Sequence, residues 1–394
     1  MKLVPGYGLA KALAGAGLIS LLAACGAAST ATPSAPSSPP AAAGAASSGS
    51  PQAAGSWDDT VAAAKKESKV VILGPNGSDV QQGLTDPFHR KYPQIDVNYD
   101  GPPPPQIPPK LLNEQAAGQH VTDLVIVGTT TILLDLRPAG AIVPVPPYLT
   151  GPESKNESKW MGGKFDYADD AGQYNLAFGV RVQIPFIYNP SMVQASDIHS
   201  WKDLLDPKWK GKMAMLDPRQ AGAGQDMSLF LFTNPKLGKD VLKGLYSQNL
   251  ILSRDDRQVL DWVGQGKYPI GIGASGVIAY ELQKKGLPLE FFPSEQLAEG
   301  SFITTSNATI GIHKDPPHPN ALKVYLDYLL SQEGQTEWSK GSGLASRRLD
   351  VPRDFLPPGI LPKDGVTYQE NYREQFQKSK DELQAFIKDN LPAS

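Results

Sequence analysis

The chain from Trp57 onward alternates short apolar runs with helical patterns, and this alternation limits the possible folds more than any other feature. The apolar runs are Val70–Leu73, Ile95–Tyr99 and Leu124–Val127, and the helical patterns are Trp57–Ser68, Gln81–Lys91 and Lys110–Ala117. Strands that alternate with helices predict an α/β fold with a parallel sheet. Ligands of such sheets bind at loops after the carboxyl ends of strands, here Gly74–Ser78 and Gly128–Thr131.

The middle of the chain repeats this pattern. Strands are predicted at Met213–Leu216, Ile270–Ile272, Leu289–Phe292 and Thr309–Ile312, and helices at Gln225–Thr233, Asp240–Ser247, Asp255–Gly264, Ala279–Lys285 and Pro319–Ser331. At roughly 150 residues per domain, the chain from Trp57 to its end is long enough for two lobes. Near the end, one helical face in Thr367–Leu391 is expected to dock on a lobe through Tyr372, Phe376, Leu383, Phe386 and Ile387.

Composition and motifs exclude several classes of protein. With 37 basic and 40 acidic residues and a net charge of −3, the chain has no basic stripe for nucleic acid. Its one cysteine excludes a disulfide framework, a Cys-ligated zinc site and an iron–sulfur cluster. Gly273–Val277 lacks the last glycine of a nucleophile elbow, and Ala221–Gly224 lacks the last glycine of a dinucleotide fingerprint. We therefore expect no catalysis, no cofactor and no metal centre.

The N-terminus predicts export. Lys2 and Lys11 precede the apolar run Ala12–Ala24, and small residues at Ala23 and Ala24 stand before Cys25. This arrangement resembles the bacterial lipobox, in which the cysteine receives a diacylglycerol. Residues 1–24 are then a lipoprotein signal peptide, Cys25 is the lipidation site, and residues 25–56 form a disordered tether of Ala, Ser, Pro and Gly. The alternative is an ordinary secretory signal followed by a stray cysteine.

The turn Ala221–Gly224 is the best candidate for ligand binding. It connects a predicted strand to a predicted helix, and the free N–H groups at a helix start bind anions. The alternative is that its glycines only permit a tight turn. Four arginines could converge on this region, or each could be a solvated surface residue: Arg181, Arg219, Arg254 and Arg257. Arg257 is favoured because it stands in the first turn of a predicted helix, where the helix dipole disfavours a cation. Its position therefore needs another reason, such as ligand binding.

Matching stretches in a shared order carry a family resemblance. They include Phe88–Pro93, Ile187–Pro190, Trp201–Lys212 with Leu216–Gly222, Gly266–Pro269, Pro317–Ala321 and Ser331–Gln335. In these stretches the chain resembles extracellular solute-binding proteins of ABC importers, in the branch similar to ferric-ion-binding periplasmic proteins. The resemblance implies a two-lobe periplasmic-binding-protein-like fold (type II) with the ligand cleft at the hinge between the lobes.

The resemblance also implies a domain organisation. Residues 57–180 and 305–345 would form the first lobe, residues 181–304 the second lobe, and residues 346–394 a C-terminal helical segment that packs on a lobe. The chain would cross the hinge near Leu176–Pro185 and Phe302–Ile310.

One departure from the family pattern bears on the ligand. Iron-binding members use two adjacent tyrosines, whereas Gly273–Tyr280 holds a single tyrosine, which disfavours bare ferric ion. The favoured ligand is a small organic anion, such as a carboxylate or phosphonate. The expected binding residues are Asn76, Ser78, Thr129, Thr130, Arg181, Ala221, Gly222, Gly224, Arg257 and Ser275. Among them, Arg257→Ala is expected to abolish stabilisation by ligand.

The function that the resemblance implies is solute capture without chemistry. The lobes would close on the solute, and the closed protein would deliver it to an ABC permease and ATPase complex. The protein would be a monomer, attached through its lipid to the extracytoplasmic face of the membrane, at the cell surface or in the periplasm. Alternatives are a ferric or metal-ion-binding importer component, a solute-sensing module of a signalling system, and an esterase-like lipoprotein that uses Ser275.

Overall fold

The computed structural model describes residues 56–363 and 365–391. The expected signal peptide, Cys25 and all of the tether except Ser56 lie outside the described residues, so these features remain predictions. Among the described residues the α-helices are α1 (Trp57–Glu67), α2 (Ser78–Lys91), α3 (Ile107–Ala116), α4 (Ala223–Thr233), α5 (Gly238–Tyr246), α6 (Asp256–Gly264), α7 (Gly276–Lys284), α8 (Pro319–Leu329), α9 (Gln332–Ser342), α10 (Glu374–Gln377) and α11 (Lys380–Asn390).

The strands fall into three sheets. They are β1 (Lys69–Leu73), β2 (Asp96–Asp100), β3 (Leu124–Val127), β4 (Ile142–Val143), β5 (Asp166–Tyr167), β6 (Leu176–Ala177), β7 (Gly179–Val182), β8 (Phe186–Tyr188), β9 (Met213–Leu216), β10 (Ile251–Ser253), β11 (Ile270–Ile272), β12 (Glu290–Phe291), β13 (Phe302–Thr304), β14 (Thr309–His313), β15 (Ala345–Ser346) and β16 (Gln369–Glu370).

The first lobe is built on a seven-stranded sheet in the order β2-β1-β3-β14-β6-β5, with β4 paired to β14. Strands β1, β2 and β3 are parallel, as the alternation predicts. The expectation of a parallel sheet is wrong for β14, which runs antiparallel to β3. This strand follows the second crossing of the chain between the lobes, and it enters the sheet from the opposite direction.

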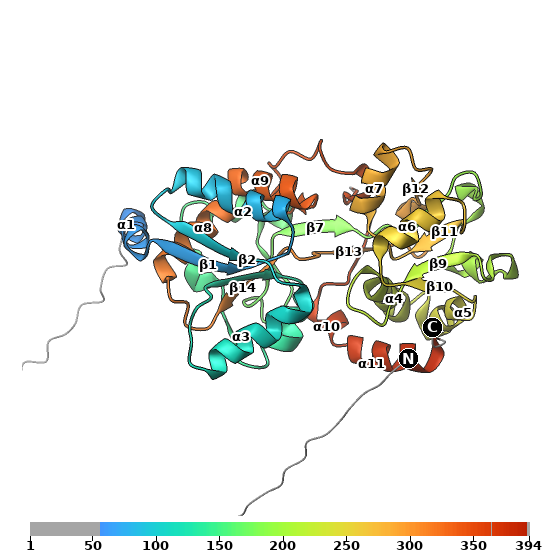
Figure 1. The fold of residues 1–394 in the computed structure, drawn as a ribbon, viewed down its shortest axis with the longest axis horizontal. Coiled ribbons are helices and arrows are strands. Elements are labelled where there is room, and N and C mark those ends of the chain that lie inside the picture. Colours follow the sequence, from blue (N-terminus) through green and yellow to red (C-terminus); the bar gives the residue numbers. More distant parts are fainter. Residues whose placement is uncertain (1–55, 364, 392–394) are drawn as a thin grey trace, which may run out of the picture. The chain divides into compact units, whose positions relative to one another are not determined.

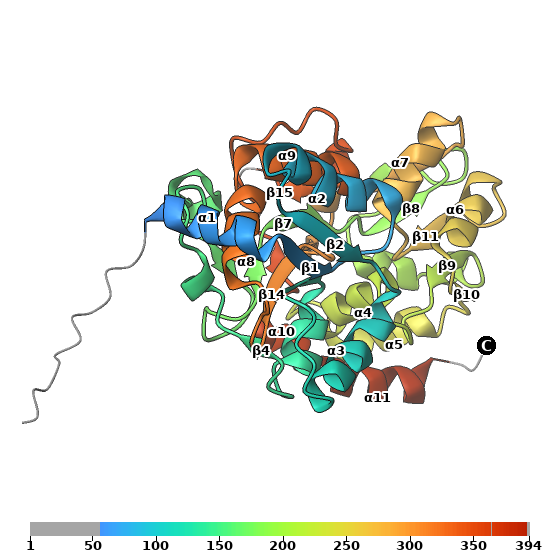
Figure 2. The same cartoon turned by 60° about the vertical axis from the view of Figure 1, so that its left-hand side comes forward.

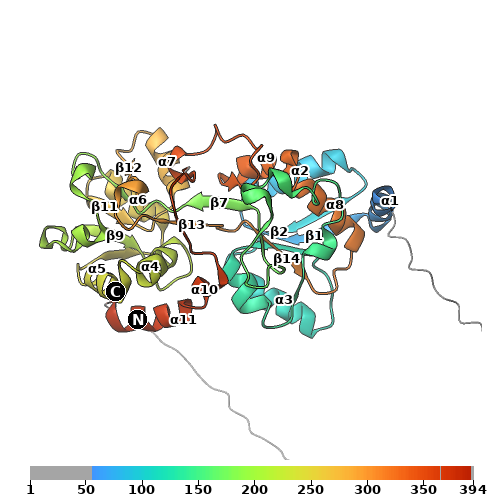
Figure 3. The same cartoon turned by 180° about the vertical axis from the view of Figure 1, so that it is seen from behind.

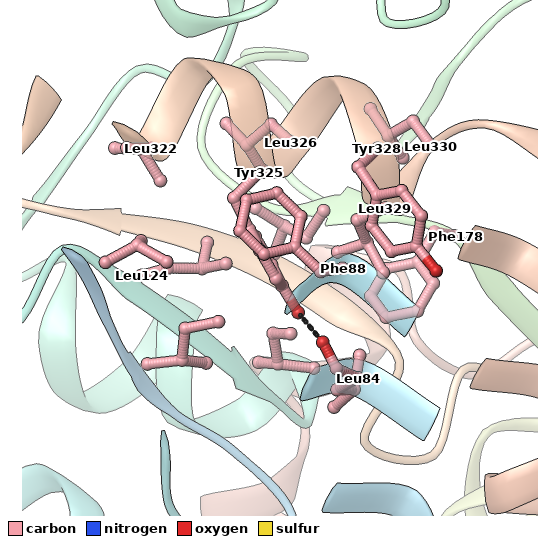
Figure 4. Close-up of a cluster of buried hydrophobic side chains, with 14 of the residues drawn as sticks. Leu84, Phe88, Leu124, Phe178, Leu322, Tyr325, Leu326, Tyr328, Leu329 and Leu330 are labelled. Carbon is pink, nitrogen blue, oxygen red and sulfur yellow. Dashed lines mark hydrogen bonds between the residues drawn. The ribbon is translucent and has the colours of Figure 1, made fainter. Parts of the chain in front are cut away.

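Helices cover both faces of this sheet because its strands are apolar on both sides. In β3, Leu124 and Ile126 join the core under α2 and α8, whereas Val125 and Val127 join the core under α3. Figure 2 shows α2 and α9 on one side of these strands and α3 on the other. Figure 4 shows the first of these cores, where the hydroxyl of the buried Tyr325 donates to the carbonyl oxygen of Leu84 at 3.0 Å.

The second lobe repeats the arrangement on a five-stranded sheet in the order β10-β9-β11-β8-β12. Met213 and Met215 of β9 pack with α4 and α5 on one face, and Ala214 packs with α6 and α7 on the other. Strands β9, β10 and β11 are parallel, so their carboxyl ends share one edge of the sheet. Helix α4 begins beyond that edge, after β9.

Two strands join the lobes. Strand β7 follows the first-lobe strand β6 and leads into the second lobe, and β13 leads back toward β14 (Figure 1). The two pair antiparallel, with Ile303 opposite Val182 and Thr304 opposite Arg181. Together with β15 and β16 they form a small four-stranded sheet, which places Arg181 between the two larger sheets.

The C-terminal segment differs from the expected single helix. Residues 369–391 contain β16, the short helix α10 and the longer helix α11. Tyr372 lies in a core with first-lobe residues, whereas Leu383 and Ile387 lie in the core of the second lobe. Phe376 and Phe386 pack against the same second-lobe core, so the prediction of docking on one lobe fits four of the five side chains. It is wrong for Tyr372, which precedes α10 and lies outside both helices.

Candidate functional site

A cavity of about 290 Å³ opens where the two lobes, the connecting strands and the C-terminal segment meet. Its wall includes the loop after β3, the start of α4, the end of β13 and residues of the C-terminal segment. The lining residues are Pro75, Ile107, Ile126, Val127, Gly128, Thr129, Thr130, Thr131, Arg181, Ala221, Gly222, Ala223, Asp226, Thr304, Thr305, Ser306, Asn307, Asn371, Tyr372, Gln377 and Lys380.

The start of helix α4 forms one wall. Gly222 is the N-cap at φ +142°, and the first helical bond runs from the Asp226 N–H to its carbonyl oxygen at 2.9 Å. The N–H groups that precede Asp226 have no acceptor within the helix, so the helix presents donors and its positive dipole end at the cavity. Gly224 lies against the carbonyl oxygen of Leu216, where a Cβ would collide, and this close contact seats the helix on the end of β9.

Arg181 supplies positive charge from the connecting strand β7. Its Nε is buried without a hydrogen-bond partner, and among the described residues no carboxylate lies within 4.0 Å of its guanidinium. Burial lowers the pKa of Arg181, and the more distant carboxylates of Asp226 and Asp256 partly offset that effect. A guanidinium stays charged in proteins, so the cavity wall holds a cation that lacks a close partner anion.

A second cation reaches the cavity from α11. The Nζ of Lys380 donates to the Oγ1 of Thr130 at 2.8 Å and lies 3.2 Å from the Oδ1 of Asp226. Thr130 in turn donates to the Oε1 of Gln377 at 2.7 Å. These contacts connect the first lobe, the second lobe and the C-terminal segment.

Hydroxyl groups line the remaining polar wall. The Oγ1 atoms of Thr129 and Thr305 lie 3.3 Å apart, and the Ser306 N–H donates to the Oγ1 of Thr304 at 3.1 Å. The Oγ of Ser306 is buried without a partner. Hydroxyls both donate and accept hydrogen bonds, so this wall suits an oxygen-rich ligand.

The structure brings only some of the expected binding residues to this cavity. Thr129, Thr130, Arg181, Ala221 and Gly222 line it, and their contact with a ligand remains a prediction. Asn76 and Ser78 instead line a second cavity, of about 380 Å³, between the start of α2 and α9. Gly224 is buried behind the wall at its contact with Leu216.

Arg257 and Ser275 lie elsewhere. The side chain of Arg257 is 55% exposed and pairs with Asp261 on α6, at 3.5 Å. Ser275 caps α7, and its N–H donates to the Oδ1 of Asp256 at 2.6 Å. Neither borders the cavity, and Arg219 and Arg254 pair with Asp217 at 2.8 and 3.7 Å.

Sequence reasoning missed Asp226, Lys380, Gln377, Asn371 and the 304–307 loop. Like Arg257, Lys380 is a cation in the first turn of a helix, and this feature could have identified it in the sequence. Its contact with Thr130 could not be predicted, because the two residues are 250 positions apart in the sequence.

No group of three or more His, Cys, Asp or Glu side chains within residues 56–363 and 365–391 could hold a metal ion. Tyr280, the single tyrosine of residues 273–280, lies outside the cavity wall and packs under the ammonium of Lys284. None of the helices in this part of the chain has the length and apolar character to cross a membrane.

Known proteins with the same fold bind different solutes. Structures of similar fold include a Trichodesmium protein in complex with iron and citrate (TM-score 0.63, 18% identity, 82% of this chain and 98% of that chain). Another is the periplasmic binding protein AfuA of Actinobacillus pleuropneumoniae with fructose 6-phosphate (TM-score 0.63, 19% identity, 83% and 99%). A third is iron-bound HitA of Pseudomonas aeruginosa (TM-score 0.62, 17% identity, 82% and 98%). These confirm the two-lobe α/β fold.

Sequence comparison agrees with the fold. A Salmonella typhimurium protein named as a candidate 2-aminoethylphosphonate-binding periplasmic protein is 27% identical over 175 residues, which cover 44% of this chain. The match spans about half (51%) of that relative's length. Residues 72–336 match the family described as bacterial extracellular solute-binding protein, whose members bind small solutes for transporters and are not enzymes. The chain belongs to this family of bacterial extracellular solute-binding proteins.

Proposed function

We propose that the protein captures a small organic anion by closure of its two lobes and delivers it to an ABC permease. The observation that carries the proposal is Arg181, a partly buried guanidinium in the cavity wall, whose Nε is buried without a partner and which has no close partner anion. An uncompensated buried charge is costly, and a bound anion removes that cost. The start of α4 adds N–H donors on the same cavity.

The charges on the wall favour a ligand with net negative charge. Arg181 and Lys380 are the cations among the lining residues and Asp226 is the carboxylate, so the wall carries a net charge of +1. A carboxylate, a phosphate ester or a phosphonate that carries an ammonium group all satisfy this balance. The hydroxyls of Thr129, Thr305 and Ser306 supply neutral hydrogen bonds to such oxygens.

Several ligands named for related proteins support this class, although iron-bound HitA names the metal alone. The names of the similar proteins include 2-aminoethylphosphonate, fructose 6-phosphate, and iron with citrate. Each of these ligands contains a phosphoryl, phosphonyl or carboxylate oxygen. A bare ferric ion is disfavoured for this chain, because a hard cation would face Arg181 and Lys380 without the paired tyrosines.

Closure would take place about the two connecting strands. We place the lobe boundaries at residues 180/181 and 304/305, within or next to β7 and β13. A solute that touches both lobes binds the closed form better than the open form, and this difference shifts the hinge equilibrium. The membrane permease would then bind the closed form, and the solute would pass from the cleft into the permease.

We also propose that the chain is held at the membrane by lipid on Cys25. The support is the sequence alone, and the test is incorporation of labelled fatty acid in a bacterial host. The wild-type protein should be labelled and partition with membranes, whereas Cys25→Ser should lose both properties. Equal labelling of the two proteins would contradict the anchor.

A thermal-shift screen followed by calorimetry tests the ligand class. The panel is 2-aminoethylphosphonate, inorganic phosphate, fructose 6-phosphate, citrate, ferric citrate, ferric ion with a weak chelator, and neutral sugars. At least one anion should stabilise the protein, by about 2.7 kcal/mol at a hundred times Kd, and should give saturable binding in calorimetry, whereas neutral sugars should do neither. Stabilisation by neutral sugars alone, or by ferric ion without an organic anion, would overturn the proposal.

A further inference from the structure

The C-terminal segment, residues 369–391, follows the stretch that matches the family, residues 72–336, yet it reaches into the cavity. We propose that Lys380 of this segment is a ligand-binding residue, whose ammonium holds the anion against both lobes at once. The inference rests on the proposed function and deepens it, since it assigns the second cation of the site to a part of the chain that the family match does not include.

The hydrogen-bonding geometry of Lys380 leaves room for a ligand. Its ammonium has three N–H donors; one donates to the Oγ1 of Thr130 at 2.8 Å, and the ammonium also faces the Oδ1 of Asp226 in an ion pair at 3.2 Å. Among the described residues no third acceptor contacts the Nζ, and Lys380 borders the cavity. The remaining donor suits an anion bound in that cavity.

The position of Lys380 is fixed by anchors on both sides of it. Before it, the Glu374 carboxylate of α10 pairs with Arg137 at 3.1 Å and accepts the Asp170 N–H at 2.8 Å, both in the first lobe. After it, α11 inserts Leu383 and Ile387 into the second-lobe core. Figure 3 shows α10 below the connecting strands β7 and β13, and α11 continuing below α4 of the second lobe. The segment thus holds the Lys380 side chain at the junction of the lobes.

The environment of this lysine is unusual for a surface helix. Lys380 is 8% exposed although it stands in the first turn of α11, where the helix dipole disfavours a cation. Desolvation of an ammonium is costly, and Asp226 offsets that cost. An anion on the third donor would add a second negative partner and stabilise the same buried position.

Lys380 also links solute capture to lobe closure. Thr130 belongs to the loop after β3 in the first lobe, and Asp226 belongs to α4 in the second. Separation of the lobes must break the contact of Lys380 with one of the two. An anion that also binds Lys380 therefore strengthens the closed form more than the open form.

The test compares Lys380→Met and Lys380→Arg with the wild-type protein, and uses Lys388→Met as the matched control. Lys388 lies on the same helix with an exposed side chain. Isothermal calorimetry with 2-aminoethylphosphonate and with inorganic phosphate should show roughly tenfold to hundredfold weaker binding for Lys380→Met. Lys380→Arg should recover most of the loss, and Lys388→Met should bind as the wild type does.

Hydrogen–deuterium exchange of residues 374–390 supplies a readout that does not require a known ligand. In the ligand-free protein, Lys380→Met should exchange faster across α10 and the start of α11 than Lys388→Met, because the link between Thr130 and Asp226 is lost. Equal exchange in the two variants would contradict the link.

The outcomes separate the two proposals. If the wild type binds an anion and Lys380→Met binds it equally well, the assignment of Lys380 is wrong and the proposed function stands. If the wild type binds none of the tested anions, the proposed function and the ligand role of Lys380 both fail. Faster exchange in Lys380→Met would then support a purely structural link.

Discussion

The Nε of Arg257 lies 3.5 Å from the Oδ1 of Asp261, one turn further along the exposed face of α6. The two acidic residues before Arg257 have structural roles of their own. Asp255 caps α6 by accepting the Arg257 N–H at 2.8 Å, and Asp256 accepts the Ser275 N–H at 2.6 Å. The run of charges that singled out Arg257 in the sequence is thus explained by helix capping and by a surface ion pair.

Arg257→Ala should leave ligand binding unchanged. An exposed pair four residues apart on a helix contributes only about 0.3–0.5 kcal/mol, so the free energy of unfolding should fall by no more than that. Calorimetry should give a Kd within about twofold of the wild type. Loss of ligand-induced stabilisation in this variant would restore the assignment made from the sequence.

Arg181→Met should weaken anion binding tenfold or more without destabilising the ligand-free protein. The reason is that methionine removes a partly buried charge that has no close partner, and it keeps much of the apolar stem. Urea unfolding without ligand should give an unchanged or higher free energy, and calorimetry should show the loss. Arg257→Met is the matched control, and wild-type affinity in Arg181→Met would exclude Arg181 from the site.

Local patterns in the sequence predicted those parts of the fold and site that depend on neighbouring residues. The buried strand β3 follows from four consecutive apolar residues, and Thr129 and Thr130 follow from the rule that ligands bind after parallel strands. The turn at Gly222 follows from its position between β9 and α4. Each of these needs only a short stretch of chain.

Features that depend on distant packing escaped prediction. Helix α9 is polar and contains two glycines, so its periodicity is weak. Both glycines allow close approach, since a Cβ on Gly341 would strike the carbonyl of Asp79 on α2, and one on Gly334 would strike that of Tyr328. Lys380 also escaped prediction because its role depends on distant packing, namely on how residues 374–390 dock on both lobes.

Gly224→Ala should destabilise the second lobe and the cavity wall together. The added methyl would overlap the carbonyl oxygen of Leu216 at the end of β9, and backbone cannot yield as a flexible side chain can. We expect a loss of about 1–3 kcal/mol in the free energy of unfolding, and weaker anion binding as the start of α4 moves.

Gly244→Ala on α5 is the control for this substitution. There the methyl would meet only the side chain of Leu205, at 3.1 Å, and alanine favours the helix. Urea unfolding followed by tryptophan fluorescence should show little change for Gly244→Ala. An equally small change for Gly224→Ala would contradict the tight contact between α4 and β9.

His313 should make the stability of the protein fall as the pH falls from 7.5 to 5.5. The side chain is fully buried in β14, and burial lowers the pKa of this histidine, with a smaller contribution from His120 in the same direction. In the unfolded chain a histidine takes up a proton near pH 6.5, whereas the folded protein keeps His313 neutral to lower pH. The unfolded state therefore binds more protons in this window, and acidification favours unfolding.

Comparison of His313→Leu with the wild type isolates this effect, because the other titrating groups are shared. Burial raises the pKa of the nearby Asp123 carboxyl, so that group takes up its proton more readily in the folded state and acts with the opposite sign, equally in both proteins. Urea unfolding at pH 7.5, 6.5 and 5.5 should show a free energy that falls less steeply for His313→Leu, by up to about 1.4 kcal/mol per pH unit. His199→Gln, at an exposed position of the second lobe, should keep the wild-type slope. Equal slopes for His313→Leu and the wild type would show that His313 titrates alike in the folded and unfolded states.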